Sequence, residues 1–83
     1  PPNSCRSSSS IVASGSAVDG KYIRNISWPS HVALIDIRRS EREIIPDFSV
    51  RIQAGDYLYV LTDTVEGAET VRSLVEQENT KNA

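Results

Sequence analysis

The middle of the chain alternates between apolar and polar residues, which is the pattern of half-buried β-strands. "HVALIDIRR" (31–39) predicts a strand with one face made of Ala33, Ile35 and Ile37. The charged turn "RSERE" and then "EIIP", which a proline ends, predict a short return strand and therefore a hairpin. "FSVRIQ" (48–53) predicts a further strand, whose apolar face carries Phe48, Val50 and Ile52.

The strongest strand signal is "YLYVL" (57–61), the most apolar strand of the chain. It follows Gly55 and Asp56, a pair that suits either a ligand-binding turn or a structural corner. We favour the corner, because glycine adopts the positive φ of a tight reversal and aspartate accepts hydrogen bonds from its own turn. Nearer the N-terminus, "IVA" (11–13) predicts one more brief strand.

Two segments have helical spacing of their apolar residues. Residues 20–26 predict a short helix that Pro29 cannot continue, packed by Tyr22, Ile26 and Trp28. Residues 64–78 predict a longer helix with Asp63 or Thr64 as its N-cap. The apolar stripe of this second helix consists of Val65, Ala68, Val71, Leu74 and Val75.

The resulting order, β-α-β-β-β-β-α, indicates an α+β fold: a small, mostly antiparallel sheet with the helices on one side. The chain has 83 residues, which is enough for one domain only. We place that domain at residues 11–79. The Pro/Ser-rich residues 1–10 are expected to be a disordered linker or tail, and residues 80–83 a frayed C-terminus.

Composition narrows the function classes. The formal net charge is −2, so no basic excess indicates nucleic acid, and the apolar runs are far shorter than the roughly 20 residues of a membrane helix. Cys5 is the single cysteine, so the domain has no internal disulfide. Because so small a domain buries little surface, association into a homodimer is the expected means of covering more apolar area.

Candidate catalytic groups are scarce. His31 is the only histidine and has no neighbouring cysteine or histidine in the sequence, so we predict no metal site, no cofactor and no enzymatic activity. Arg38, Arg39 and Arg42 could together grip an anion. The interleaved Glu41 and Glu43 favour instead a solvated hairpin tip with cross-strand ion pairs.

Tyr57 and Tyr59 alternate along the most apolar strand and therefore share one face of the sheet. That face is either a second covered side of the sheet or an interface between two copies of the chain. Aromatic residues are enriched at such interfaces, so both tyrosines are candidate dimer-interface residues.

Four short motifs, in order, resemble the TrkA C-terminal domain, also called the RCK C-terminal domain: "GKYIRNISWP", "ALIDIRR", "EIIP" and "IQAGDYLYVL". The links "ISWP" and "IIP" are most similar to the copy fused to ClC-type chloride channels and transporters. Three positions depart from the family pattern. Ser40 and Phe48 stand where glycine is usual, and Val50 stands where threonine is usual.

The resemblance implies a cytoplasmic regulatory and dimerisation domain attached to a membrane ion transporter, on the cytoplasmic side of the cell membrane. A ClC-type chloride channel or antiporter is the first choice. A potassium or sodium/proton transport system and a purely structural dimerisation module are the alternatives. Some relatives bind cyclic di-AMP between two copies, and the candidate ligand-binding residues here are Arg24, Asn25, Arg38 and Pro46.

Overall fold

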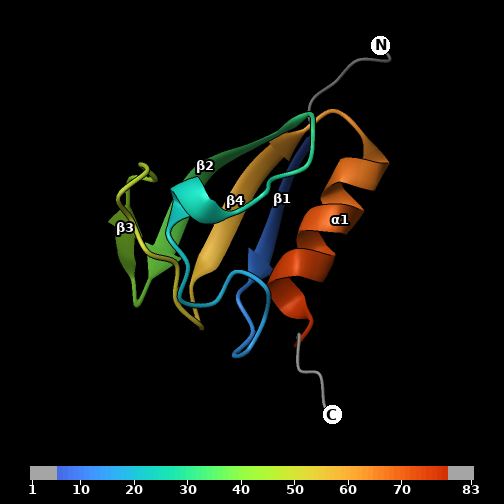
Figure 1. The fold of residues 1–83 in the computed structure, drawn as a ribbon. Helices are drawn as coiled ribbons and strands as arrows, with labels where there is room; N and C mark the ends of the chain where they lie inside the picture. The colour runs from blue at the N-terminus through green and yellow to red at the C-terminus, as the bar shows by residue number, and fades with distance from the viewer. Residues whose placement is uncertain (1–5, 79–83) are drawn as a thin grey trace.

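The computed structural model describes residues 6–78, and these form one antiparallel sheet with a helix packed on one face (Figure 1). The sheet order is β1-β4-β2-β3. The strands are β1 (Arg6–Ile11), β2 (Val32–Arg39), β3 (Arg42–Ile44) and β4 (Tyr57–Thr62), and the helix is α1 (Val65–Glu76). The predicted α+β class, with a mostly antiparallel sheet, is confirmed. Cys5 and residues 80–83 lie outside the described residues.

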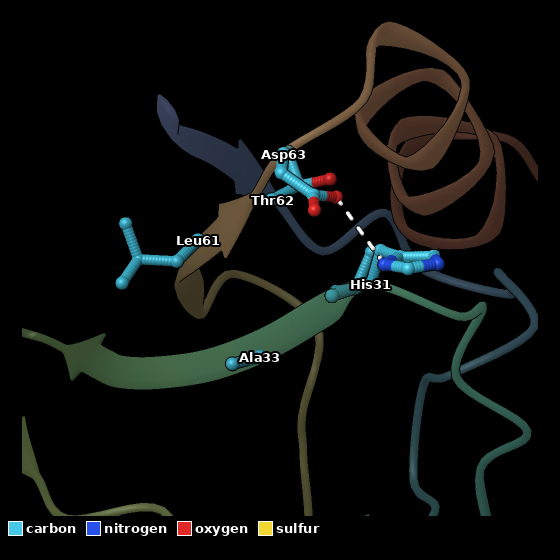
Figure 2. Close-up of a pocket in the computed structure, with 6 residues that line it drawn as sticks. His31, Ala33, Leu61, Thr62 and Asp63 are labelled. Carbon is cyan, nitrogen blue, oxygen red and sulfur yellow. Dashed lines mark ion pairs between the residues drawn. The ribbon is translucent and has the colours of Figure 1, made fainter. Parts of the chain in front are cut away.

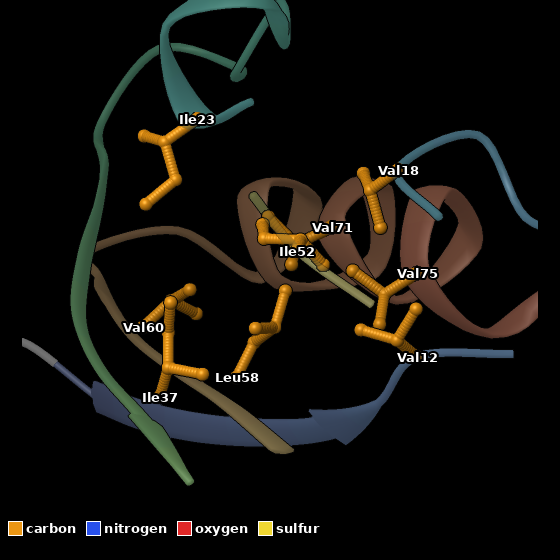
Figure 3. Close-up of a cluster of buried hydrophobic side chains, with 9 residues drawn as sticks. All are labelled: Val12, Val18, Ile23, Ile37, Ile52, Leu58, Val60, Val71 and Val75. Atoms are coloured by element: carbon orange, nitrogen blue, oxygen red, sulfur yellow. The ribbon is translucent and has the colours of Figure 1, made fainter. Parts of the chain in front are cut away.

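Strand β4 lies inside the sheet, between β1 and β2, and pairs with both. Leu58, Val60 and Thr62 on one of its faces are buried. They form the core with α1 and the segments that precede β2 and β4, as Figure 3 shows. The nine buried apolar side chains are Val12, Val18, Ile23, Ile37, Ile52, Leu58, Val60, Val71 and Val75.

The serine-rich segment contradicts part of the sequence prediction. Residues 6–10 were assigned to a disordered tail, but they form most of β1 and pair with β4 in register. The strand predicted at 11–13 therefore starts five residues earlier, and residues 1–5 lie outside the described part of the chain. Backbone hydrogen bonds rather than apolar side chains hold β1 to its neighbour. The small Ser10 is buried on the helix side, where α1 packs against β1.

A β-bulge in β2 overturns the predicted strand faces. Leu34 pairs with Val60, but Asp36 already pairs with Tyr59, so Ile35 is the extra residue. Leu34 faces the core before the bulge and Ile37 faces it after the bulge, although they lie three positions apart in the sequence. Ile35 consequently lies on the outer face with 45% of its surface exposed. The predicted hairpin between β2 and β3 is confirmed.

The predicted helix at 20–26 is wrong, and so is the predicted strand at 48–53. Only a 3-10 turn forms, η1 (Ile23–Asn25), and the second segment makes a single bridge between Tyr22 and Arg51. Backbone hydrogen bonds between the two segments take the place of helix or strand pairing. The Ile23 amide donates to the Val50 carbonyl at 3.0 Å, and neighbouring bonds join residues 20–21 to residue 52.

Helix α1 is confirmed, with Thr64 as its N-cap. The Thr64 side chain accepts a hydrogen bond from the Gly67 amide at 2.9 Å. Gly67 lies so close to the sheet that an added Cβ would come within 2.6 Å of the Thr62 hydroxyl. Its missing side chain therefore lets the first turn of α1 approach β4. Within residues 6–78, no helix is long and apolar enough to cross a membrane.

The turn before β4 is the structural corner that the sequence predicted. Gly55 has φ +93°, and the buried Asp56 carboxylate accepts a hydrogen bond from the Gln53 amide at 2.9 Å. The carboxylate also accepts two hydrogen bonds from Arg39, each 2.9 Å long. This bidentate ion pair raises the pKa of Arg39, and it joins the end of β2 to the turn.

Candidate functional site

An apolar groove of about 280 Å³ lies between η1, the inward face of β2 and the loop that follows β3. It is lined by Ile23, Arg24, Ile26, Trp28, Val32, Leu34, Pro46 and Phe48. The loop after β3 contributes Pro46 and Phe48 to this lining, and Asp47 between them accepts hydrogen bonds from the Ser49 amide and hydroxyl. That turn leaves the Phe48 side chain 72% exposed at the groove.

Arg24 is the only charged residue of the groove lining. Its Nη1 donates to the Phe48 carbonyl oxygen at 3.1 Å, which ties η1 to the loop. Its guanidinium carbon lies 4.6 Å from the centre of the Tyr22 ring, within cation–π range. The groove therefore has a positively charged rim above an apolar floor.

A second arginine reaches the same tyrosine. The guanidinium carbon of Arg51 lies 5.1 Å from the Tyr22 ring centre, and its Nη2 donates to the Tyr22 hydroxyl at 3.4 Å. The hydrogen bond from Arg51 and then its charge lower the pKa of Tyr22, and the charge of Arg24 adds to the effect. We call Tyr22, Arg24 and Arg51 the Tyr22 platform.

These features suit one kind of ligand. An apolar floor with an exposed phenyl and an indole at its edge accommodates a flat ring, and guanidinium groups bind phosphate or carboxylate. The arrangement fits an amphiphilic anion such as a nucleotide.

The structure brings only two of the four predicted ligand residues together. Arg24 and Pro46 line the groove. Asn25 lines a neighbouring hollow of about 200 Å³ that also contains Lys21. Arg38 pairs with Tyr57 across the sheet, so its side chain is on the outer face, away from the groove.

Sequence reasoning missed Phe48 and Arg51 as candidate site residues. Phe48 was expected on the apolar face of a strand with Val50 and Ile52, but it lies in a turn that begins at Asp47 and is exposed. Arg51 lies next to Tyr22 because a β-bridge pairs these two residues, which are far apart in the chain, and no local sequence pattern predicts that pairing. The departure at Phe48 from the usual glycine was the one available signal.

The hairpin arginines do not form a joint anion site. Arg39 forms an ion pair with Asp56, and Arg38 lies on the outer face of the sheet. Within residues 6–78, the ion pairs include none between these arginines and Glu41 or Glu43, so the predicted cross-strand pairs are absent there.

The outer face of the sheet, opposite α1, exposes several large apolar side chains. Tyr57 and Tyr59 lie on it as predicted, with ring centres 6.5 Å apart and planes inclined by 24°. Ile11 and Arg38 pair with Tyr57, Ser9 and Asp36 pair with Tyr59, and the exposed Leu61 pairs with Ala33, so exposed aliphatic and polar residues both surround the tyrosines. No described segment covers these side chains.

A further hollow, of about 360 Å³, lies at the start of β2 and the end of β4 (Figure 2). His31 Nδ1 lies 3.5 Å from Asp63 Oδ1, and both side chains are largely exposed. Two ligands are too few for a stable metal site. Among the described residues, no group of three or more His, Cys, Asp or Glu side chains gathers to hold a metal.

The comparisons with known proteins agree with this fold. A family model described as the TrkA-C domain matches residues 9–75. The solved structure of an RCK domain with cda is 20% identical, with a TM-score of 0.69, and the match covers 88% of this chain and 99% of that one. A search of curated proteins found no match.

Proposed function

Because the chain belongs to the TrkA-C domain family, whose model spans residues 9–75, we propose that it is a regulatory domain of a membrane ion-transport system. In this proposal the domain lies on the cytoplasmic side of the membrane and binds a small ligand. The groove is the observation that supports ligand binding, since it combines an apolar floor with the guanidinium of Arg24.

A nucleotide is the proposed ligand, with cyclic di-AMP as the first candidate. The structural neighbour with the same fold was solved with cda, which we interpret as cyclic di-AMP. In this proposal a purine ring stacks on Trp28 or Phe48, which line the groove together with Arg24 and Pro46. A ligand bound in this way regulates transport only if the attached pore has states that differ in affinity for it.

The transporter proposed is a ClC-type chloride channel or antiporter, on the resemblance of "ISWP" and "IIP" to the copies fused to such proteins. A potassium or sodium/proton transport system is the alternative. The nature of the membrane segments in the same or an associated chain decides between them.

Cyclic di-AMP is expected to stabilise the domain, by about 2.7 kcal/mol at a concentration 100 times its Kd. Phe48→Ala should weaken binding about tenfold, because stacking of a base on an aromatic ring contributes roughly 1–3 kcal/mol. Thermal denaturation and isothermal titration calorimetry measure both effects. Ile45→Ala is the matched control, since Ile45 lies on the same loop with 76% of its surface exposed and outside the groove.

Equal binding by the two variants would exclude the groove as the site. A folded protein that no nucleotide stabilises, cyclic di-AMP and ATP included, would contradict ligand sensing. A domain that dimerises but ignores these nucleotides would instead be a purely structural module.

We further propose that the outer face joins two copies into a homodimer. It exposes Tyr57, Ile11 and Leu61 beside Tyr59, and aromatic residues are enriched in the surfaces that interfaces bury. Tyr59→Asp should convert a dimer to a monomer in light scattering, because a buried, unpaired carboxylate opposes association. Thr70→Asp, on the exposed side of α1, is the control and should leave the mass unchanged. An unchanged mass for Tyr59→Asp would exclude this surface.

A further inference from the structure

Two positively charged groups converge on one tyrosine ring in the Tyr22 platform. Arg24 and Arg51 each place a guanidinium carbon within 5.1 Å of the ring centre. The three side chains come from segments that the backbone ties together. The bridge between Tyr22 and Arg51 and the bond from the Ile23 amide to the Val50 carbonyl fix their relative positions.

Within the described residues, no carboxylate forms an ion pair with Arg24 or Arg51. The ion pairs of residues 6–78 join Asp63 to His31, Asp56 to Arg39 and Glu76 to Arg72, and none includes Arg24 or Arg51. The nearby Asp47 carboxylate accepts from the Ser49 amide and hydroxyl. Neither guanidinium is therefore neutralised by an ion pair within the domain, and both can interact with an anion from solution.

Both guanidiniums also keep free donors. Each carries five N–H groups. Arg24 uses one toward the Phe48 carbonyl, and Arg51 uses one in a long hydrogen bond to the Tyr22 hydroxyl. The remaining donors match the several acceptor oxygens of a phosphate group.

We propose that the Tyr22 platform is a phosphate-binding site, in which Arg24 and Arg51 donate to the oxygens of one phosphate group. Arg24 also lines the groove, so a phosphate bound to Arg24 lies at the edge of the groove. This assignment deepens the proposed function and rests on it for the identity of the ligand. Free phosphate would occupy the same donors without filling the groove.

Arg51→Gln tests the site, because it removes one guanidinium that does not line the groove. Calorimetric titrations at low ionic strength would use cyclic di-AMP, pyrophosphate and adenosine. We expect affinity for the two phosphate-bearing compounds to fall at least tenfold and affinity for adenosine to change less than twofold. Arg42→Gln, at the exposed hairpin, changes the net charge equally and should leave all three affinities unaltered.

A second readout is spectroscopic. In ¹⁵N NMR spectra of arginine side chains, pyrophosphate should shift the Nε signals of Arg24 and Arg51 but not that of Arg42. A bound phosphate should also raise the pKa of Tyr22 toward its usual value, since it offsets the charges that lower it.

The outcomes separate this site from the proposed function. Undiminished binding of cyclic di-AMP to Arg51→Gln would leave the ligand-sensing function intact and overturn the phosphate site. Equal losses in Arg51→Gln and Arg42→Gln would also overturn it, because a general charge effect would then explain both. A third outcome is that the domain does not bind cyclic di-AMP, while Arg51→Gln alone lowers the affinity for pyrophosphate. This result would support the phosphate site and reject cyclic di-AMP as the ligand.

Discussion

Replacing Asp56 with alanine is expected to lower the free energy of unfolding by about 3 kcal/mol, because the change leaves a charge without its buried partner. A domain of this length has a total stability of roughly 4–12 kcal/mol. The loss corresponds to a fall in Tm of roughly 15 °C. Urea denaturation followed by circular dichroism measures it.

The geometry explains why the effect is large. The Asp56 side chain is 1% exposed, and all its hydrogen bonds come from within the domain. Arg39 donates from Nε and Nη2, and its Nη2 also donates to the Arg51 carbonyl at 2.9 Å. Asp56 therefore holds the end of β2, its own turn and the segment that carries Arg51. Because 31% of the Arg39 side chain is exposed, water offsets part of the loss, and we expect a value at the lower end of the range for buried pairs.

Two controls sharpen the experiment. Asp47→Ala removes an exposed aspartate that also caps a turn, and should lower stability by less than about 1 kcal/mol. The double variant Arg39→Met with Asp56→Leu removes both charges, and should be more stable than Asp56→Ala alone. Equal stability of Asp56→Ala and Asp47→Ala would contradict a structural role for the Arg39–Asp56 pair.

The sequence could identify this turn but not its partner. A Gly-Asp pair before an apolar strand is a local pattern, and the predicted corner is confirmed at Gly55 and Asp56. Arg39 is 17 residues away from Asp56 in the chain. In sequence it is one of three clustered arginines, and only the pairing of β2 with β4 singles it out.

Strand faces were predictable only while the two-residue period held. The bulge at Ile35 adds one residue to β2, so every later side chain changes sides relative to the prediction. Ile37, placed correctly in the apolar set, is buried, whereas Ile35 is exposed. No glycine or other distinctive residue marks this bulge in the sequence. The segment "ALIDI" instead has the regular alternation of an uninterrupted strand.

Hydrophobicity was likewise a poor guide to β1. Four consecutive serines indicate a linker by composition, but backbone pairing with β4 needs no apolar side chain. The candidate site was predictable only in part for the same reason. Arg24 and Pro46 lie at one groove, while Phe48 and Arg51 join them through a turn and a bridge that depend on the folded backbone.

Leu58→Ala is expected to lower the free energy of unfolding by about 3 kcal/mol, since it removes buried methyl groups and leaves a cavity. Leu58 is 1% exposed and lies among the buried side chains of the core (Figure 3). It pairs with Ile37 on β2 and with Ser10 on β1. Thermal and urea denaturation should give a loss that does not depend on protein concentration, because both the monomer and a dimer contain this core.

Leu61→Ala is the matched control, since it makes the same change three residues later on the opposite face of β4. Leu61 is 36% exposed and lies on the outer face, so in a monomer the loss should be below about 1 kcal/mol. If the outer face joins two copies, the wild-type Tm rises with protein concentration, and Leu61→Ala reduces that rise. A concentration-independent loss of about 3 kcal/mol for Leu61→Ala would mean that the domain itself buries this side chain, and would contradict an outer face open to a partner.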